Sequence, residues 1–344
     1  MAHLAFIFCC IVWGTSFILL ERVTHVFGPV EIAIWRLFSG AVVVGFFWWL
    51  KRGEARMRRR DWVYMILASL LLTAPPQVIQ AYVLSQGYGH SFFGTMVAAV
   101  PLLTILVSMP MLGLLPTPKE LIGVLGGLLC MSLLVDDGMD RGMSLGLLGL
   151  TFLIPLSSAV SNTFIKWKLR HVPAAPLTTT LLLSAGVALV PLEMSSGGLG
   201  ALHLDGPVNA TVTPTAIFYL FLLGVVASGL STLAFIWMIL KKGPLYAGMT
   251  TYVVPVLALL WGTVDSETIS VRQAVAIGGV LFMVALVQSS SPAVDVEREA
   301  EPSMRDVAEL LAQPVGAEPQ LAVVSAPELE APTSLVTQPE SQVA

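Results

Sequence analysis

Charged residues are scarce in this sequence of 344 residues. Asp, Glu, Lys and Arg together make up 12%, whereas hydrophobic residues make up 56%. An ordinary soluble domain carries about 25% charged residues, roughly twice this share. A soluble fold cannot bury so much apolar surface, so the composition predicts an integral membrane protein.

Cysteine is also rare. The three cysteines, Cys9, Cys10 and Cys130, lie inside apolar runs. A thiol in such a run packs as a small hydrophobic group, so the sequence predicts no disulfide framework.

Acidic residues and histidines are missing from the middle of the apolar segments. Glu31, Glu193 and Glu267 stand at segment ends, and the five histidines lie at ends or in loops. The pattern therefore indicates no proton relay at mid-membrane depth, no enzyme, no metal site and no cofactor. The sequence also has no Gly-rich Lys-Ser/Thr motif for binding nucleotide phosphates.

The apolar segments are long enough to cross a bilayer as helices, which takes about 20 residues each. Charges and Gly/Pro positions divide the chain into ten candidate spans. They cover residues 4–20, 30–50, 62–84, 91–115, 120–136, 143–165, 176–193, 215–240, 245–263 and 271–288. The fourth and fifth spans are separated only by a short segment containing Pro116 and Pro118, which interrupt a continuous helix.

The last part of the chain has a different composition. Residues 289–344 contain ten acidic residues, two arginines and seven prolines. Such a segment cannot build an apolar core, which predicts a disordered acidic tail.

The positions of Lys and Arg predict the orientation. With the N-terminus in the cytoplasm, twelve of these residues fall on cytoplasmic loops and three, Arg22, Arg141 and Arg272, on outer loops. This bias predicts cytoplasmic N- and C-termini in a cytoplasmic membrane.

The sequence repeats itself at an offset near 150 residues. Gly89–Pro101 aligns without gaps on Gly243–Pro255, and Gly126–Met131 aligns on Gly278–Met283. The repeat predicts two five-helix units, residues 1–138 and 139–288, followed by the tail. Because five is odd, the two units cross the membrane in opposite senses, an inverted repeat from which alternating-access transporters are built.

Several short motifs carry a resemblance to a known family. They are Trp13-Gly14-Thr15-Ser16-Phe17, Ile34-Trp35-Arg36, the Gly…Pro segments ending at Pro101 and Pro255, and Gly278-Gly279. In this order and duplication, over residues 4–288, the chain resembles the EamA-type members of the drug/metabolite transporter superfamily. The resemblance implies ten helices in an inverted repeat, and efflux or exchange of amino acids, related metabolites or drug-like amphiphiles. The family's Gly-Glu pair is matched only in the second half, by Glu267.

Arg36 is the most informative single residue. It lies about 9 Å below the outer membrane interface at 1.5 Å per residue. A cation at that depth is costly unless it faces a polar cavity or snorkels. Two interpretations therefore stand: a substrate contact, or a structural pair with Glu31.

Other polar and aromatic residues inside apolar spans are candidates for lining a substrate cavity. The predicted substrate-binding residues are Trp13, Ser16, Arg36, Gln77, Gln80, Asn162 and Tyr252. Gly14, Pro101 and Pro255 are predicted to serve as hinge or packing positions. For Trp13 to Ser16, and for the glutamines after Pro75-Pro76, helix packing is the competing interpretation.

Together these features predict a secondary transporter, in the exporting direction, with a small-molecule substrate and the lipid bilayer as partners. A homodimer is possible, and no nucleic acid partner is expected. The alternatives are a lipid or lipid-intermediate flippase of the same superfamily and a membrane protein with a structural role. No channel-like filter or charged ring is present in the sequence.

Overall fold

The computed structural model describes residues 2–51, 57–113, 118–140, 142–195, 204, 211–266 and 269–288. Across these ranges the chain is helical, with short connections and no strand. The predicted tail, residues 289–344, and the segment with Pro116 lie outside the described residues.

Eight helical elements lie in the described residues of the first half. They are α1 (Ala2–Thr24), α2 (Pro29–Lys51), α3 (Arg59–Ala68), η1 (Ser69–Thr73), α4 (Ala74–Ser85), α5 (His90–Val97), α6 (Val100–Leu112) and α7 (Pro118–Asp140).

The second half has a similar sequence of elements. They are α8 (Leu145–Lys168), α9 (Ala174–Met194), α11 (Pro214–Leu222), η2 (Leu223–Leu230), α12 (Ser231–Lys242), α13 (Pro244–Gly248), α14 (Thr250–Val264) and α15 (Val271–Gln288).

Local sequence signals set where several of these helices begin. Ser144 caps α8, its Oγ accepting a hydrogen bond of 3.2 Å from the Leu147 N–H. Thr213 caps α11 in the same way through Ala216, and Pro214 follows at the first helical position, where its missing N–H costs nothing. Lysines in the last turns of α8 and α12 lie at the negative ends of the helix dipoles.

Eight helices in the described residues are long and apolar enough to cross a membrane. Two of them are composite: Arg59–Ser85 joins α3, η1 and α4, and Pro214–Lys242 joins α11, η2 and α12. Two further apolar segments, Val100–Leu112 and Val271–Met283, are shorter. The all-helical membrane fold is therefore confirmed, while the count of ten spans stays a prediction.

The two composite helices share an unusual feature, a π-helical segment in the middle. η1 begins at Ser69 and η2 at Leu223, and in each a wider turn interrupts the α-helix. Gly89 and Gly243, aligned in the sequence repeat, follow α4 and α12 with φ of 87° and 91°. A side chain would strain that left-handed backbone, so glycine suits both turns.

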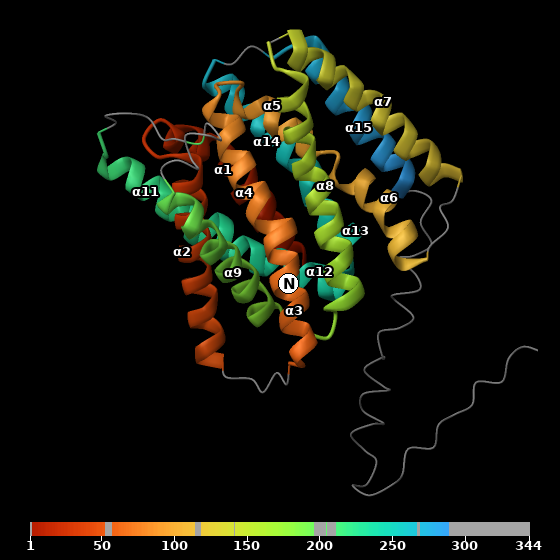
Figure 1. Cartoon of the computed structure of the whole chain (residues 1–344). Helices are drawn as coiled ribbons and strands as arrows, with labels where there is room; N and C mark the ends of the chain where they lie inside the picture. Colours follow the sequence, from red (N-terminus) through yellow and green to blue (C-terminus); the bar gives the residue numbers. More distant parts are fainter. Residues whose placement is uncertain are drawn as a thin grey trace, which may run out of the picture. The chain divides into compact units, whose positions relative to one another are not determined.

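Helices of the two halves pack in pairs. α2 packs along α9, and α7 along α15, which run side by side in Figure 1. α1 packs on α14 and α12, whereas α8 packs on α6, α4 and η1.

Glycines allow the closest of these helix contacts. A Cβ on Gly14 would lie 2.5 Å from the Leu257 Cβ, so the predicted packing position joins α1 to α14. A Cβ on Gly279 would clash with the Cys130 Sγ, which shows how closely α15 approaches α7.

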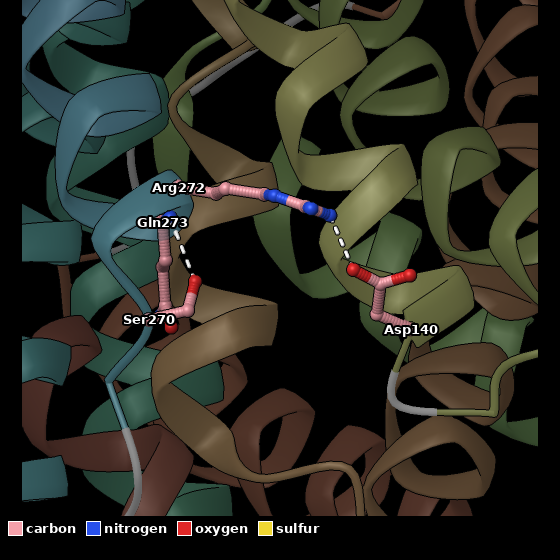
Figure 2. A network of polar contacts seen from close by, with 4 residues as sticks. All are labelled: Asp140, Ser270, Arg272 and Gln273. Carbon is pink, nitrogen blue, oxygen red and sulfur yellow. Dashed lines mark hydrogen bonds and ion pairs between the residues drawn. The ribbon is translucent and has the colours of Figure 1, made fainter.

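Ion pairs join the two halves at the end of the helices predicted to face outward. Arg22 on α1 pairs with Asp265 after α14, with 3.0 Å between Nη2 and Oδ1. Figure 2 shows Arg272 of α15 reaching Asp140 at the end of α7. In the same view Ser270 caps α15, its Oγ accepting a hydrogen bond of 3.0 Å from the Gln273 N–H.

Candidate functional site

A cavity of about 220 Å³ lies among helices from both halves of the chain. Its wall includes residues of α1, α2, η1, α4, α8, α9, η2, α12 and α14. The wall is largely apolar with a small number of polar groups, which is the usual composition of a small-molecule site.

Six of the seven predicted substrate-binding residues line this cavity: Trp13, Ser16, Arg36, Gln77, Gln80 and Asn162. The seventh, Tyr252, belongs to α14, but its side chain lies outside the described part of the structure. Its neighbour Thr251 lines the cavity. The structure thus brings the predicted residues together, and their binding role stays a prediction.

Arg36 is buried, with only 5% of its surface exposed. Its Nε donates a hydrogen bond of 3.1 Å to Ser228 Oγ on η2, and its Nη1 donates one of 3.4 Å to Gln80 Oε1 on α4. Within the described ranges no carboxylate forms an ion pair with Arg36, so the alternative pairing with Glu31 is not found. Arg36 is therefore a buried cation held only by neutral groups.

The position of Arg36 depends on a close crossing of α2 and η2. One turn after Arg36, a Cβ on Gly40 would lie 3.0 Å from the Gly229 backbone nitrogen and 3.1 Å from the Gly224 carbonyl oxygen. Only glycine leaves room for two backbones at this distance. The crossing sets Ser228 directly against the Arg36 side chain.

Trp13 is anchored at the wall through its indole nitrogen. Nε1 donates a hydrogen bond of 3.1 Å to the carbonyl oxygen of Ala227 in η2, and the ring packs 4.8 Å from that of Phe235. The nearby Val226 carbonyl accepts from Ser231 Oγ at 2.7 Å. Carbonyl groups of the π segment thus accept bonds from side chains, and one such bond fixes the Trp13 ring.

Ser16 and the two glutamines differ in how much of their hydrogen-bonding capacity is used. Ser16 Oγ donates to the Trp13 carbonyl at 2.8 Å, so its hydroxyl proton is committed within α1. Gln80 accepts from Arg36. Gln77 Oε1 is buried without a partner in the described structure.

Asn162 on α8 is the clearest unsatisfied group. Only 5% of the surface of Asn162 is exposed, and its Nδ2 has no hydrogen-bond partner among the described residues. Buried polar groups are nearly always satisfied, because leaving one unpaired costs about 1–3 kcal/mol. Asn162 Nδ2 and Gln77 Oε1 therefore hold unused hydrogen-bonding capacity in two residues of the cavity wall.

The predicted hinge or packing prolines also act on the wall. Proline has no N–H to donate to the carbonyl four residues earlier. For Pro101, in the first turn of α6, that residue is Val97, and for Pro255, inside α14, it is Thr251. Val97 and Thr251 both line the cavity, so the two aligned prolines follow wall residues that occupy matching places in the sequence repeat.

Sequence reasoning missed Ser228 and the π segments. The small-residue run Ala227-Ser228-Gly229 inside an apolar span was a usable signal, because small residues mark close helix contacts. The winding of η1 and η2 has no comparable signature in the residues themselves.

Comparisons with known proteins agree with this architecture. Residues 1–135 match the EamA-like transporter family. The uncharacterised inner membrane transporter YedA of Escherichia coli K12 is 28% identical over 289 residues, covering 80% of this chain and 87% of YedA. The YedA proteins of the CFT073 and O157:H7 strains match equally.

A protein with a solved crystal structure shares the fold. It has a TM-score of 0.59 and 17% sequence identity, over 87% of this chain and 98% of its own. With the sequence motifs and the apolar helices, these findings confirm the resemblance. The chain is thus similar to EamA-like transporters over residues 1–135 and to an inner membrane transporter over most of its length, and its long apolar helices are those of a multi-pass membrane protein.

Proposed function

We propose that this transporter exports small metabolites that carry a carboxylate or similar anionic group, such as amino acids or drug-like amphiphiles, by alternating access. The observation that carries the proposal is the buried Arg36 on the cavity wall, bonded to Ser228 and Gln80 and to no carboxylate among the described residues.

The charge of Arg36 favours an anionic group on the substrate. Removing a guanidinium from water costs several kcal/mol, and hydrogen bonds to neutral oxygens offset only part of that cost. A carboxylate entering the cavity would form a charge-assisted pair, which is roughly twice as strong as a neutral hydrogen bond. The site thus favours a ligand of opposite charge.

The free amide groups complement this charge. Asn162 Nδ2 can donate to a substrate oxygen, and Gln77 Oε1 can accept from an N–H or O–H group. A substrate with a carboxylate and a separate donor would satisfy Arg36, Asn162 and Gln77 together.

The packing of the helices supports two inverted five-helix halves, residues 1–138 and 139–288. If α1 corresponds to α8 and α14 to α6, the pair α1 with α14 is equivalent to α8 with α6. The contact of α1 with α12 is equivalent to that of α8 with α4. The pairs α2–α9 and α7–α15 each join one helix to its counterpart in the other half, so exchanging the halves leaves each pair unchanged. Such equivalence is expected of a pseudo-two-fold axis between the halves, with the site beside it.

The direction of transport and the cytoplasmic placement of both termini rest on the family resemblance and on the distribution of Lys and Arg.

Transport by the purified protein in proteoliposomes tests the proposal. Labelled amino acids, organic anions and cationic dyes would be followed in both directions, with and without a pH gradient. Saturable movement of carboxylate-bearing solutes, reduced in Arg36→Gln, is the expected result. Movement of cationic dyes alone would contradict the proposed substrate class. Rapid lipid scrambling without solute movement would instead identify a flippase.

A further inference from the structure

Among the described residues, arginines at the two ends of the helix bundle differ in their partners. At the end predicted to face outward, Arg22 and Arg272 each pair with an aspartate. At the opposite end, Arg58, Arg59, Arg60 and Arg170 are exposed. None of these four, which we call the basic site, forms an ion pair with a carboxylate in the described part of the chain.

A buried carboxylate holds the two parts of the basic site together. Asp61 in the first turn of α3 is fully buried, and its Oδ2 accepts a hydrogen bond of 2.8 Å from the Arg58 N–H. The same oxygen lies 3.1 Å from Nε2 of His171, which follows α8. This contact holds the start of α3, which carries Arg59 and Arg60, against the segment after α8, which carries Arg170.

Ring contacts strengthen the same junction. Tyr64 of α3 meets Phe164 of α8 edge-on, with ring centroids 6.0 Å apart, and Phe164 lies 6.4 Å from Trp167. The junction of α3 and α8 is thus held by packed aromatic groups as well as by Asp61 and His171.

An exposed apolar strip runs along α3 and η1 from the basic site. Trp62, Val63, Ile66, Leu67, Leu70 and Leu71 are all exposed large hydrophobic residues. Their spacing of three and four residues places them on one helical face, so the strip begins within one turn of Arg59. Exposed Trp62 and Trp167 flank the arginines, and tryptophan is enriched at the headgroup level of membranes.

We propose that the basic site binds the phosphate headgroup of an anionic phospholipid, whose acyl chain lies along the α3 strip. Guanidinium groups bind phosphate through paired N–H donors. An apolar strip directly beneath fixed cations matches a lipid, which has a charged head and an apolar chain. This inference is independent of the substrate cavity and does not rest on the proposed function.

Lipid retention by the full-length protein tests the proposal. Protein would be reconstituted in nanodiscs of equal phosphatidylcholine and phosphatidylglycerol, extracted in mild detergent at low salt, and analysed by native mass spectrometry. Arg59→Gln/Arg170→Gln would be compared with Arg22→Gln/Arg272→Gln, which removes the same charge from the paired end.

We expect wild-type protein to retain phosphatidylglycerol in preference to phosphatidylcholine. Each Lys or Arg near an anionic surface contributes about a fivefold gain in affinity, so the Arg59→Gln/Arg170→Gln protein should bind phosphatidylglycerol about 30-fold more weakly. The Arg22→Gln/Arg272→Gln protein should retain it, and raised salt should weaken retention by the wild type.

A lysine version, Arg59→Lys/Arg170→Lys, keeps the charge and should recover most of the retention. Recovery in the lysine variant would show that the glutamine variant lost the charge of the site and did not misfold. Gel filtration of each variant reports misfolding directly. Equal loss in the two glutamine variants, or equal retention of both lipids by the wild type, would overturn the proposal.

Discussion

The Nε of Arg36 and the Oγ of Ser228 lie 3.1 Å apart, joined by a hydrogen bond across 192 residues of chain. The bond connects α2 of the first half to η2 of the second at the cavity wall. It occupies one edge of the guanidinium, while Gln80 takes a donor on Nη1. Because a guanidinium has five N–H donors, the others remain for a ligand in the cavity.

Replacing Arg36 by Gln should reduce transport of carboxylate-bearing substrates about 10- to 100-fold, because a hydrogen bond to a charged group contributes about 1.5–3 kcal/mol. Membrane expression should persist, since a buried unpaired charge is removed. Initial rates in proteoliposomes over a range of substrate concentrations measure the change. Arg36→Lys keeps the charge but not the planar set of donors, so its transport rate should lie between those of the wild type and Arg36→Gln. A poorly expressed Arg36→Gln protein with normal specific activity would support a structural role instead.

Replacing Ser228 by Ala should act through Arg36. Loss of the acceptor frees the guanidinium to rotate away from the cavity, and we expect a several-fold rise in KM with little change in kcat. In the Arg36→Gln background the same substitution should have almost no further effect, because interacting residues are not additive. Fully additive effects in this double-mutant cycle would show that Ser228 works independently.

Asn162→Ala should separate stability from transport. Its Nδ2 is buried without a partner in the described structure, so removing the amide relieves a desolvation cost that offsets the small cavity created. We expect a thermal midpoint within a few degrees of wild type and a clear fall in transport. A large drop in the midpoint, measured by thermal shift in detergent, would mean that the amide is a structural group.

Gly229→Ala should destabilise the crossing of α2 and η2. An added Cβ would lie 3.0 Å from the Gly40 Cα, and forcing apart packed backbones costs about 1–3 kcal/mol. Gly149→Ala in α8 is the matched control, because a Cβ there meets nothing within 4 Å. The thermal midpoint should fall for the first and hold or rise for the second; similar midpoints for both would contradict the close crossing.

The Arg22–Asp265 pair should contribute little to stability. The two side chains are 47% and 32% exposed, and exposed ion pairs contribute about 0–1 kcal/mol. A cycle of Arg22→Gln and Asp265→Asn should give a coupling energy in that range, decreasing with salt. A coupling well above it would indicate a shielded pair.

Much of the fold could be predicted from the sequence, because length and apolar composition identify membrane helices. The expected span 30–50 became α2, Pro29–Lys51, and 62–84 falls within Arg59–Ser85. The expected span 91–115 did not anticipate the turn at Ala98 and Ala99 that separates α5 from α6. Neither alanine disfavours a helix, so that break is set by packing and not by local propensity.

The cavity residues were predictable for a similar reason. A polar group such as Arg36 or Asn162 inside an apolar span must face something other than lipid, and the centre of the bundle is the remaining place. Ser228 was not predictable at the same level, since its role depends on the wider turn of η2 and on the Gly40–Gly229 approach. Both are properties of the assembled backbone.

The prolines and π segments have one further consequence. Pro101 and Pro255 fix the backbone and lack an N–H four residues after the wall residues Val97 and Thr251, and the helix geometry at both places depends on these prolines. Substitutions at Arg36, Gln77 or Asn162 can alter which solute is preferred without removing them. The wall therefore combines a backbone geometry set by two aligned prolines with a few exchangeable side chains, a division that would let related chains diverge in cargo while keeping the same passage.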